Sequence, residues 1–317
     1  MDYSNSHGTK RLADPATAQN YPLPCQQKPI WHQRDDTIVA NISLEHLDAA
    51  SILVPSCSMK DPNLSYKITL IDSGERWELP RIPIQKDIPE KVHGDRRVST
   101  HVDCFHIHKT LHAPILEYTV NMMEIPKTYL ISCSWRPLDL NMQKITTPRS
   151  RAFCHEPRAI SQHQDGGEIG SRICSPTSLC MVLESYGTNV DLLSISADCY
   201  DPITELYGIW PKAIHTAGKN GHLGSIETFI DWRKAIILLE AGYPIVTSIR
   251  FRSGELQGAP MKSSAGHLTV VHGISETEIR VYDPGASDKN GVNRTYSAME
   301  FSQAWLSYRG VAYIVLP

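Results

Sequence analysis

Three residues in the C-terminal half of the chain have the types and the order of a thiol catalytic triad. Cys174 stands between a glycine-rich loop and an apolar segment, His267 enters a β-branched run, and Asp283 comes just before a Pro-Gly turn. A cysteine nucleophile needs a base beside it, and a carboxylate can hold the imidazole of that base in one tautomer. The sequence therefore predicts Cys174 as the nucleophile, His267 as the base and Asp283 as the group that orients His267.

The first of these residues is expected at the start of a helix. Residues 174–186 carry apolar side chains at helical spacing, Ser175 could cap the helix, and Pro176 suits its first turn. A thiol at this position faces unpaired N–H groups and the positive end of the helix dipole, which favours the thiolate. Taken alone, the segment is equally compatible with a buried structural cysteine that happens to open a helix.

Two strands are expected to carry the other two residues. Segments 263–274 and 278–285 both have the β-branched and aromatic content of strands, and few residues separate them. A tight loop between two antiparallel neighbours would bring His267 and Asp283 side by side. The strand pattern thus supports the same triad as the residue types.

An oxyanion donor is expected upstream of the cysteine. Gln162 is the natural candidate, and Gln164 competes with it. Three residues that adjoin the predicted catalytic groups are candidates for substrate contact, namely His163, Gly266 and Ser175. The predicted site contains no metal ligand and needs no cofactor.

The motifs around these residues resemble one known family. They are Ser-Gln followed by Asp-Gly-Gly at 161–167, Cys-Ser-Pro-Thr-Ser at 174–178, Ala-Gly-Tyr-Pro-Ile-Val-Thr-Ser-Ile at 241–249, Gly-His-Leu-Thr-Val-Val at 266–271 and Tyr-Asp-Pro at 282–284. In this order they are similar to the papain-like cysteine peptidases of the bacteriocin-leader-processing type. The resemblance covers residues from about 155 to 317. It implies the same roles for Cys174, His267, Asp283 and Gln162. Relatives often have an aromatic residue where this chain has Ile173, which could reshape the site wall.

The expected fold class of the C-terminal half is α+β. The pattern at 228–240 predicts an amphipathic helix, and 245–249 predicts a buried strand. A helical part and a small antiparallel sheet are the two parts of a papain-like cysteine peptidase domain, whose active site lies in the cleft between them. Loops around 200–224 and 252–264 are expected to build the walls of that cleft.

The N-terminal half is expected to be a separate all-β unit. Strand patterns occur at 37–42, 66–71, 118–122 and 128–132, with Pro, Gly, Asp and Asn between them, which favours a β-sandwich. We therefore expect the following organisation: a flexible N-terminal tail at 1–28, a β-sandwich-like accessory domain at 29–142, a linker at 143–157 and a papain-like catalytic domain at 158–317.

Composition limits the partners of the protein. The chain has 317 residues and a formal net charge of −3, which gives no electrostatic reason to bind nucleic acid or an anionic membrane. No window approaches the length of an apolar membrane span, and the N-terminus lacks the apolar core of a signal peptide. The expected location is therefore the cytoplasm. Eight cysteines without regular spacing fit reduced thiols better than a disulfide framework.

A second cluster of chemically active side chains lies in the β unit. Twelve residues contain His101, Asp103, Cys104, His106, His108 and His112. Alternate residues of a strand share a face, so part of this set could bind zinc or another transition metal. The spacing matches no structural zinc module, and a polar strand is the preferred interpretation.

The predicted function is thiol-dependent acyl transfer. With water as the acceptor, the protein would be a cysteine peptidase or amidase acting on a peptide or amide. With another acceptor it would be an acyltransferase, thioesterase or cyclase, acting on an acyl or peptidyl thioester that a carrier protein could hold. A non-catalytic binding protein with the same fold is the third alternative. The oligomeric state is left open.

Overall fold

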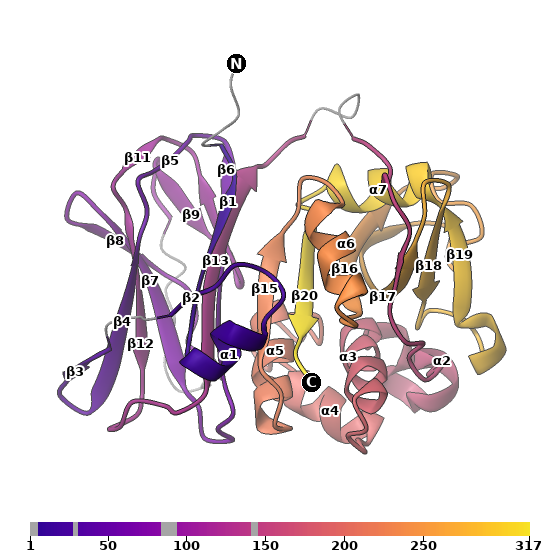
Figure 1. Cartoon of the computed structure of the whole chain (residues 1–317), viewed down its shortest axis with the longest axis horizontal. Helices are drawn as coiled ribbons and strands as arrows, with labels where there is room; N and C mark the ends of the chain where they lie inside the picture. Colours follow the sequence, from indigo (N-terminus) through magenta and orange to yellow (C-terminus); the bar gives the residue numbers. More distant parts are fainter. Residues whose placement is uncertain (1–5, 28–30, 84–93, 141–144) are drawn as a thin grey trace.

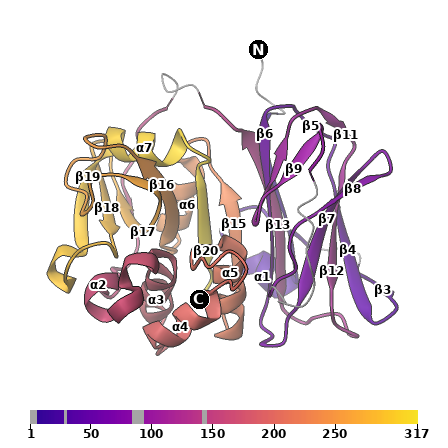
Figure 2. The same ribbon diagram turned by 180° about the vertical axis from the view of Figure 1, so that it is seen from behind.

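The computed structural model describes residues 6–27, 31–83, 94–140 and 145–317. The N-terminal half is rich in strands, and the C-terminal half combines a sheet with helices (Figures 1 and 2). The two halves lie side by side along the long axis of the molecule (Figure 1). The expected α+β class and the β-rich N-terminal region are both confirmed.

Two sheets of the N-terminal half face each other. The first has the order β2 (Gln26–Gln27), β1 (Gly8–Ala13), β13 (Tyr129–Pro137), β6 (Ser51–Met59), β10 (Phe105–Ile107) and β9 (Val98–Thr100). The second has the order β3 (His32–Arg34), β4 (Thr37–Ser43), β12 (Ile115–Val120), β7 (Tyr66–Asp72) and β8 (Glu75–Glu78). The short strands β5 (His46–Leu47) and β11 (Leu111–His112) pair with each other. One hydrophobic core, with members such as Leu53, Leu70 and Tyr118, takes side chains from both sheets.

The N-terminal residues described here do not form the flexible tail that was expected. β1 pairs with β13 over its whole length, and the helix α1 (Pro15–Asn20) follows, capped by the Asp14 carboxylate. Leu12 and Ala13 are buried. Polar composition suggested a tail, but the pairing of β1 depends on a partner more than 100 residues away, which no local pattern reveals.

The C-terminal half is built on one antiparallel sheet. Its strand order is β15 (Gly224–Thr228), β20 (Val311–Val315), β16 (Ile245–Phe251), β17 (Ser264–Ile274), β18 (Glu278–Tyr282) and β19 (Asn293–Ser297), with β14 (Ala152–Phe153) also paired to β17. The helices are α2 (Gln162–Asp165), α3 (Cys174–Ser185), α4 (Leu192–Cys199), α5 (Trp210–Lys219), α6 (Arg233–Glu240) and α7 (Ala298–Leu306). A 3-10 turn, Gly167–Arg172, lies between α2 and α3, and another, Lys289–Gly291, lies between β18 and β19. Helices α3, α4 and α5 pack together at one end of this half, and α6 and α7 lie against the sheet (Figure 1).

Two sequence expectations differ from the structure in this half. The helix expected at 228–240 begins only at Arg233, because Thr228 still belongs to the edge strand β15 and the Asp231 carboxylate accepts the Arg233 amide. Part of the expected linker forms β14, whose Ala152 is buried in the core of the C-terminal half. The chain thus joins the sheet of the C-terminal half before the first of the motifs, at 161–167, begins.

The edge strand of the C-terminal sheet lies against the first sheet of the N-terminal half. Serine hydroxyls of β6 and β13 accept hydrogen bonds from alternate backbone amides of β15: Ser58 from Gly224 (3.0 Å), Ser56 from Ile226 (3.1 Å) and Ser134 from Thr228 (2.8 Å). All three serines are buried. An exposed sheet edge would leave these amides without a protein partner. The two halves are therefore joined by a buried polar interface.

Candidate active site

Cys174 is the first residue of α3, at the end of the helix that faces a cavity. No side chain caps this helix end, and the preceding residue, Ile173, occupies the N-cap position. The expected cap by Ser175 is wrong, because Ser175 lies inside the first turn and is buried. Cys174 is half-buried and is one of the residues that line the cavity. The uncapped N–H groups remain available for an anion next to the sulfur.

His267 and Asp283 come from neighbouring antiparallel strands. His267 lies on β17, and Asp283 follows the last residue of β18. The His267 Nε2 atom is 2.7 Å from Asp283 Oδ1, and both side chains are buried. The Gly285 amide also donates to Asp283 Oδ1, at 2.9 Å. Because Nε2 is engaged by the carboxylate, Nδ1 is the ring nitrogen left for the hydrogen bond between His267 and Cys174.

A tyrosine that the sequence reasoning missed holds the second oxygen of Asp283. The Tyr296 hydroxyl, on β19, donates to Asp283 Oδ2 at 2.7 Å, and Tyr296 is buried. Each oxygen of the carboxylate therefore accepts from a different group, which fixes its plane. No motif at 293–297 signals this role, since it depends on the register of β18 with β19.

The charges in this cluster favour a thiolate beside an imidazolium. Burial by itself would raise the pKa of Cys174, but the hydrogen bond and the positive charge of His267 outweigh it and lower that pKa. Burial would likewise lower the pKa of His267, but the Asp283 carboxylate dominates and raises it to about 10. The pKa of Asp283 is lowered, since His267, Tyr296 and the Gly285 amide together outweigh burial. Both shifts favour the thiolate form of Cys174 and the protonated form of His267 over the neutral pair.

We expect the Tyr296→Phe variant to lose about tenfold in turnover, because a buried oxygen of Asp283 loses its donor. The same hydrogen bond lowers the pKa of Asp283, so its removal raises that pKa, and the acid limb of the pH–rate profile should move to higher pH. Full pH–rate profiles of wild type and variant measure both effects.

The matched control is Tyr282→Phe. The hydroxyl of Tyr282 donates to Glu156 at 3.2 Å and not to Asp283, His267 or Cys174. This substitution should leave the acid limb in place. A Tyr296→Phe profile that is lower at every pH but not shifted would mean that Tyr296 acts only in packing.

Gln162 lies at the start of α2, beside the segment that carries Asp283. Its backbone amide donates to the Pro284 carbonyl at 2.9 Å. A Cβ atom at Gly166 or Gly170 would overlap the Gln162 carbonyl oxygen, so this close turn requires glycine. The Gln162 side chain is buried, and its Oε1 atom has no hydrogen-bond partner among the described residues. This atom is the acceptor of the carboxamide, whereas an oxyanion would be bound by its NH₂ group.

The competing Gln164 has a different environment. Its side chain is exposed, and its Oε1 atom accepts the backbone amide of Lys289 at 3.1 Å. The neighbouring His163 is also exposed and does not line the cavity beside Cys174. Of the two glutamines, Gln162 is therefore the one with a free polar atom inside the protein.

The other residues expected near the substrate also differ in whether they line the cavity. Gly266 is exposed and lines the cavity, whereas Ser175 is buried and does not line it. Ile173, expected to affect the site wall, is buried in the core and is not among the cavity-lining residues. Only Gly266 of these three lies where a bound substrate could touch it.

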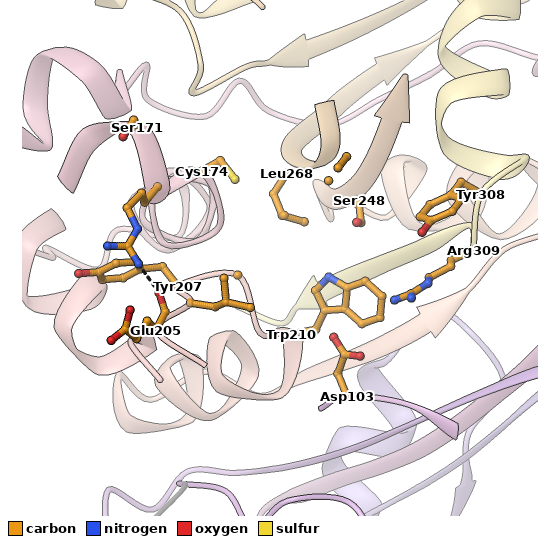
Figure 3. A pocket seen from close by; sticks show the side chains of 15 residues that line it. Asp103, Ser171, Cys174, Glu205, Tyr207, Trp210, Ser248, Leu268, Tyr308 and Arg309 are labelled. Carbon is orange, nitrogen blue, oxygen red and sulfur yellow. Dashed lines mark hydrogen bonds between the residues drawn. The ribbon is translucent and has the colours of Figure 1, made fainter. Parts of the chain in front are cut away.

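The cavity at Cys174 has a volume of about 440 Å³, within the usual range for ligand sites. Residues 205–210 form one wall, as expected for the loop around 200–224, while no residue of the other expected loop, 252–264, lines it. Figure 3 shows Cys174 at one side, Trp210 and Leu268 in the middle and Arg309 at the far side. One lining residue, Asp103, comes from the N-terminal half.

The histidine-rich segment of the β unit does not gather into a ligand set. Among the described residues, which include all of 101–112, no three His, Cys, Asp or Glu side chains come together as metal ligands. The rings of His101 and His106 lie 4.0 Å apart between centroids at an interplanar angle of 41°, and the Cys104 side chain is buried. All eight cysteine thiols are free.

A comparison with protein families places this half of the chain among the papain-like cysteine peptidases. Residues 156–313 match the model of the Peptidase_C39 like family, and this half of the chain belongs to that family. The match begins and ends within a few residues of the limits that the motifs indicated.

Two solved structures are similar to this half. One is described as a double glycine motif protease from an AMS/PCAT transporter in complex with the leader peptide; it shares 19% identity, covers 54% of this chain and 98% of its own, and has a TM-score of 0.37. The other is described as a putative C39-like peptidase from Bacillus anthracis, with 16% identity, coverage of 53% and 98%, and a TM-score of 0.40. A sequence comparison with curated proteins gave no match. In the described part of the chain, no helix combines the length and apolar character needed to cross a membrane.

Proposed function

We propose that the C-terminal half is a catalytic domain that hydrolyses a peptide or amide bond through Cys174. The observation that supports this most strongly is the connected set of Cys174, His267 and Asp283, drawn from α3, β17 and the end of β18. Three separate elements meet at one buried cluster beside a cavity. A structural cysteine would need neither the histidine nor the carboxylate.

The reaction would proceed in two half-reactions. The Cys174 thiolate attacks the carbonyl carbon, and the Gln162 carboxamide and the Cys174 backbone N–H stabilise the oxyanion. His267 gives its proton to the leaving amine, which departs and leaves an acyl-enzyme. Water then attacks the thioester, His267 accepts a proton from it, and the free acid leaves with the thiolate restored.

The first half-reaction is shared with acyltransferases, thioesterases and cyclases, which differ in the acceptor or in the acyl donor. No contact of the described residues favours one of these, whereas the family match favours a peptidase. The proposed substrate is accordingly a peptide.

Selective alkylation tests whether Cys174 is activated. At pH 6 an ordinary thiol with a pKa near 8.5 is about 0.3% thiolate, so a thiol held as thiolate should react on the order of 100-fold faster. Brief treatment with iodoacetamide should add one group to wild type and none to Cys174→Ala, as read by intact mass. The other half-buried thiols are a built-in control, because burial raises the pKa of Cys25 to about 11 and that of Cys154 to about 12.

Slow labelling that is spread over several thiols and is equal in both proteins would contradict the proposal. The third alternative, a binding protein that keeps the fold, would then be favoured.

A further inference from the structure

The N-terminal half contributes a hairpin to the wall of the cavity at Cys174. Strands β9 and β10 pair, and the turn between them is closed by a hydrogen bond from the His101 amide to the Cys104 carbonyl at 2.8 Å. β10 also pairs with β6, so the hairpin is anchored in the first sheet. At its tip, Asp103 lines the same cavity as Cys174 (Figure 3). The cavity is therefore completed by both halves of the chain.

Arg309 faces Asp103 from the other half. It lies between α7 and β20 with a left-handed backbone (φ 44°), a conformation that costs a residue with a Cβ atom about 1–2 kcal/mol. Its guanidinium lies over the rings of Tyr308 and Trp210, at 5.6 and 5.9 Å from their centroids. Among the described residues it makes no side-chain hydrogen bond or ion pair. Its donors are thus free at the cavity wall.

Asp103 also lacks a close cation. It forms no ion pair within 4.0 Å among the described residues, although the charge of Arg309 acts on it and lowers its pKa against the larger effect of burial, which raises it. The carboxylate and the guanidinium therefore lie near each other without closing on each other. Both side chains line the cavity, so a group bound there meets a carboxylate and a guanidinium together.

The chemistry of this pair selects a neutral amide. A cationic group would meet Arg309, an anionic group would meet Asp103, and an apolar group would offer no hydrogen bond to either of these half-buried side chains. A carboxamide has a carbonyl that accepts from Arg309 and an NH₂ that donates to Asp103. We propose that Asp103 and Arg309 form a specificity subsite, built by both halves of the chain, that binds an Asn or Gln side chain of the peptide substrate. This inference rests on the proposed function.

Cleavage of a defined library of synthetic peptides tests it. Mass spectrometry of the products gives the residue preference at every position around the scissile bond, so the position of the subsite need not be assumed. Wild type should favour Asn or Gln at one position over the near-isosteric Leu and Glu. Asp103→Ala and Arg309→Ala should each reduce kcat/KM for the best Gln-containing peptide by about tenfold or more and remove the preference.

Two controls separate this outcome from a general loss of activity. Glu124→Ala removes an exposed acid of the N-terminal half, and Arg250→Ala removes a cation that also stacks on Tyr308 but does not line the cavity. Neither should change the preference. Labelling of Cys174 by iodoacetamide should stay at the wild-type rate in all four variants.

The outcomes are distinguishable. Cleavage with no amide preference, or with one that survives both substitutions, would overturn the subsite and leave the proposed function standing; Asp103 would then be an interdomain contact only. Absence of both labelling and cleavage in wild type would overturn the two proposals together.

Discussion

Cys174→Ala is expected to abolish peptide cleavage, with a loss of roughly four to six orders of magnitude in kcat. Removing the nucleophile of a catalytic triad lowers kcat about as much as removing the whole triad, because no other group can form the acyl-enzyme. Alanine is a good helix former, and the position is the first of α3, so the fold should be retained. The rate of product formation from the same peptide library measures the loss of cleavage. Circular dichroism of each protein shows whether the fold is retained.

The matched control is Cys180→Ala, a second thiol on the same helix. Cys180 is buried in the hydrophobic core, and burial raises its pKa above the range in which a thiolate forms at neutral pH. Its loss should cost stability but leave cleavage close to wild type. His267→Ala should resemble Cys174→Ala, since the thiolate loses its charge partner and the leaving amine loses its acid. Full activity in Cys174→Ala would refute the assignment of the nucleophile.

Glu227→Ala is expected to give the largest loss of stability. Glu227 lies on β15, and Arg11, on β1, donates to both of its oxygens at 2.5 and 2.6 Å. Lys234 adds a third contact at 3.2 Å. The side chains of Arg11 and Glu227 are only 4% and 0% exposed, so removing the carboxylate leaves the buried Arg11 and the half-buried Lys234 without their counter-charge. Breaking a buried pair from one side costs on the order of 3–5 kcal/mol.

The same contacts predict how stability depends on pH. Burial would raise the pKa of Glu227, but Arg11 and Lys234 outweigh it and lower that pKa to about 2. A lowered folded-state pKa means that the stabilisation is complete above the ordinary value of 4.5 and is lost as the pH falls from there towards about 2. Wild type should therefore weaken over this window more steeply than Glu227→Ala.

Urea unfolding followed by tryptophan fluorescence measures these free energies. The control is Glu117→Ala. Glu117 is also buried and bound by two arginines, Arg34 and Arg76, but their side chains are 51% and 48% exposed and can return to water. Its replacement should cost about 1 kcal/mol. Equal losses in the two variants would show that the Arg11–Glu227 contact does not hold the two halves together.

The sequence by itself indicated the candidate catalytic residues because each lies in a pattern of short range. The helix after Cys174 and the strands around His267 and Asp283 are recognisable from apolar spacing and β-branched content, and the motif order added the family. Four strands of the N-terminal half, β4, β7, β12 and β13, were found for the same reason, although their ends differ by a few residues, whereas the central strand β6 was not predicted. A local pattern is enough to predict an element and the side chain at its end.

The residues that only the tertiary structure revealed are those whose role depends on strand register or on docking of the two halves. Tyr296 reaches Asp283 because β19 pairs with β18 in one register, and Asp103 reaches the cavity because the first sheet lies against β15. The alternating serines of β6 and β13 would suit a solvent-facing strand surface, yet they bind a sheet edge. Such contacts join residues tens to hundreds of positions apart, and the free energy that selects them comes from burial and pairing over whole surfaces.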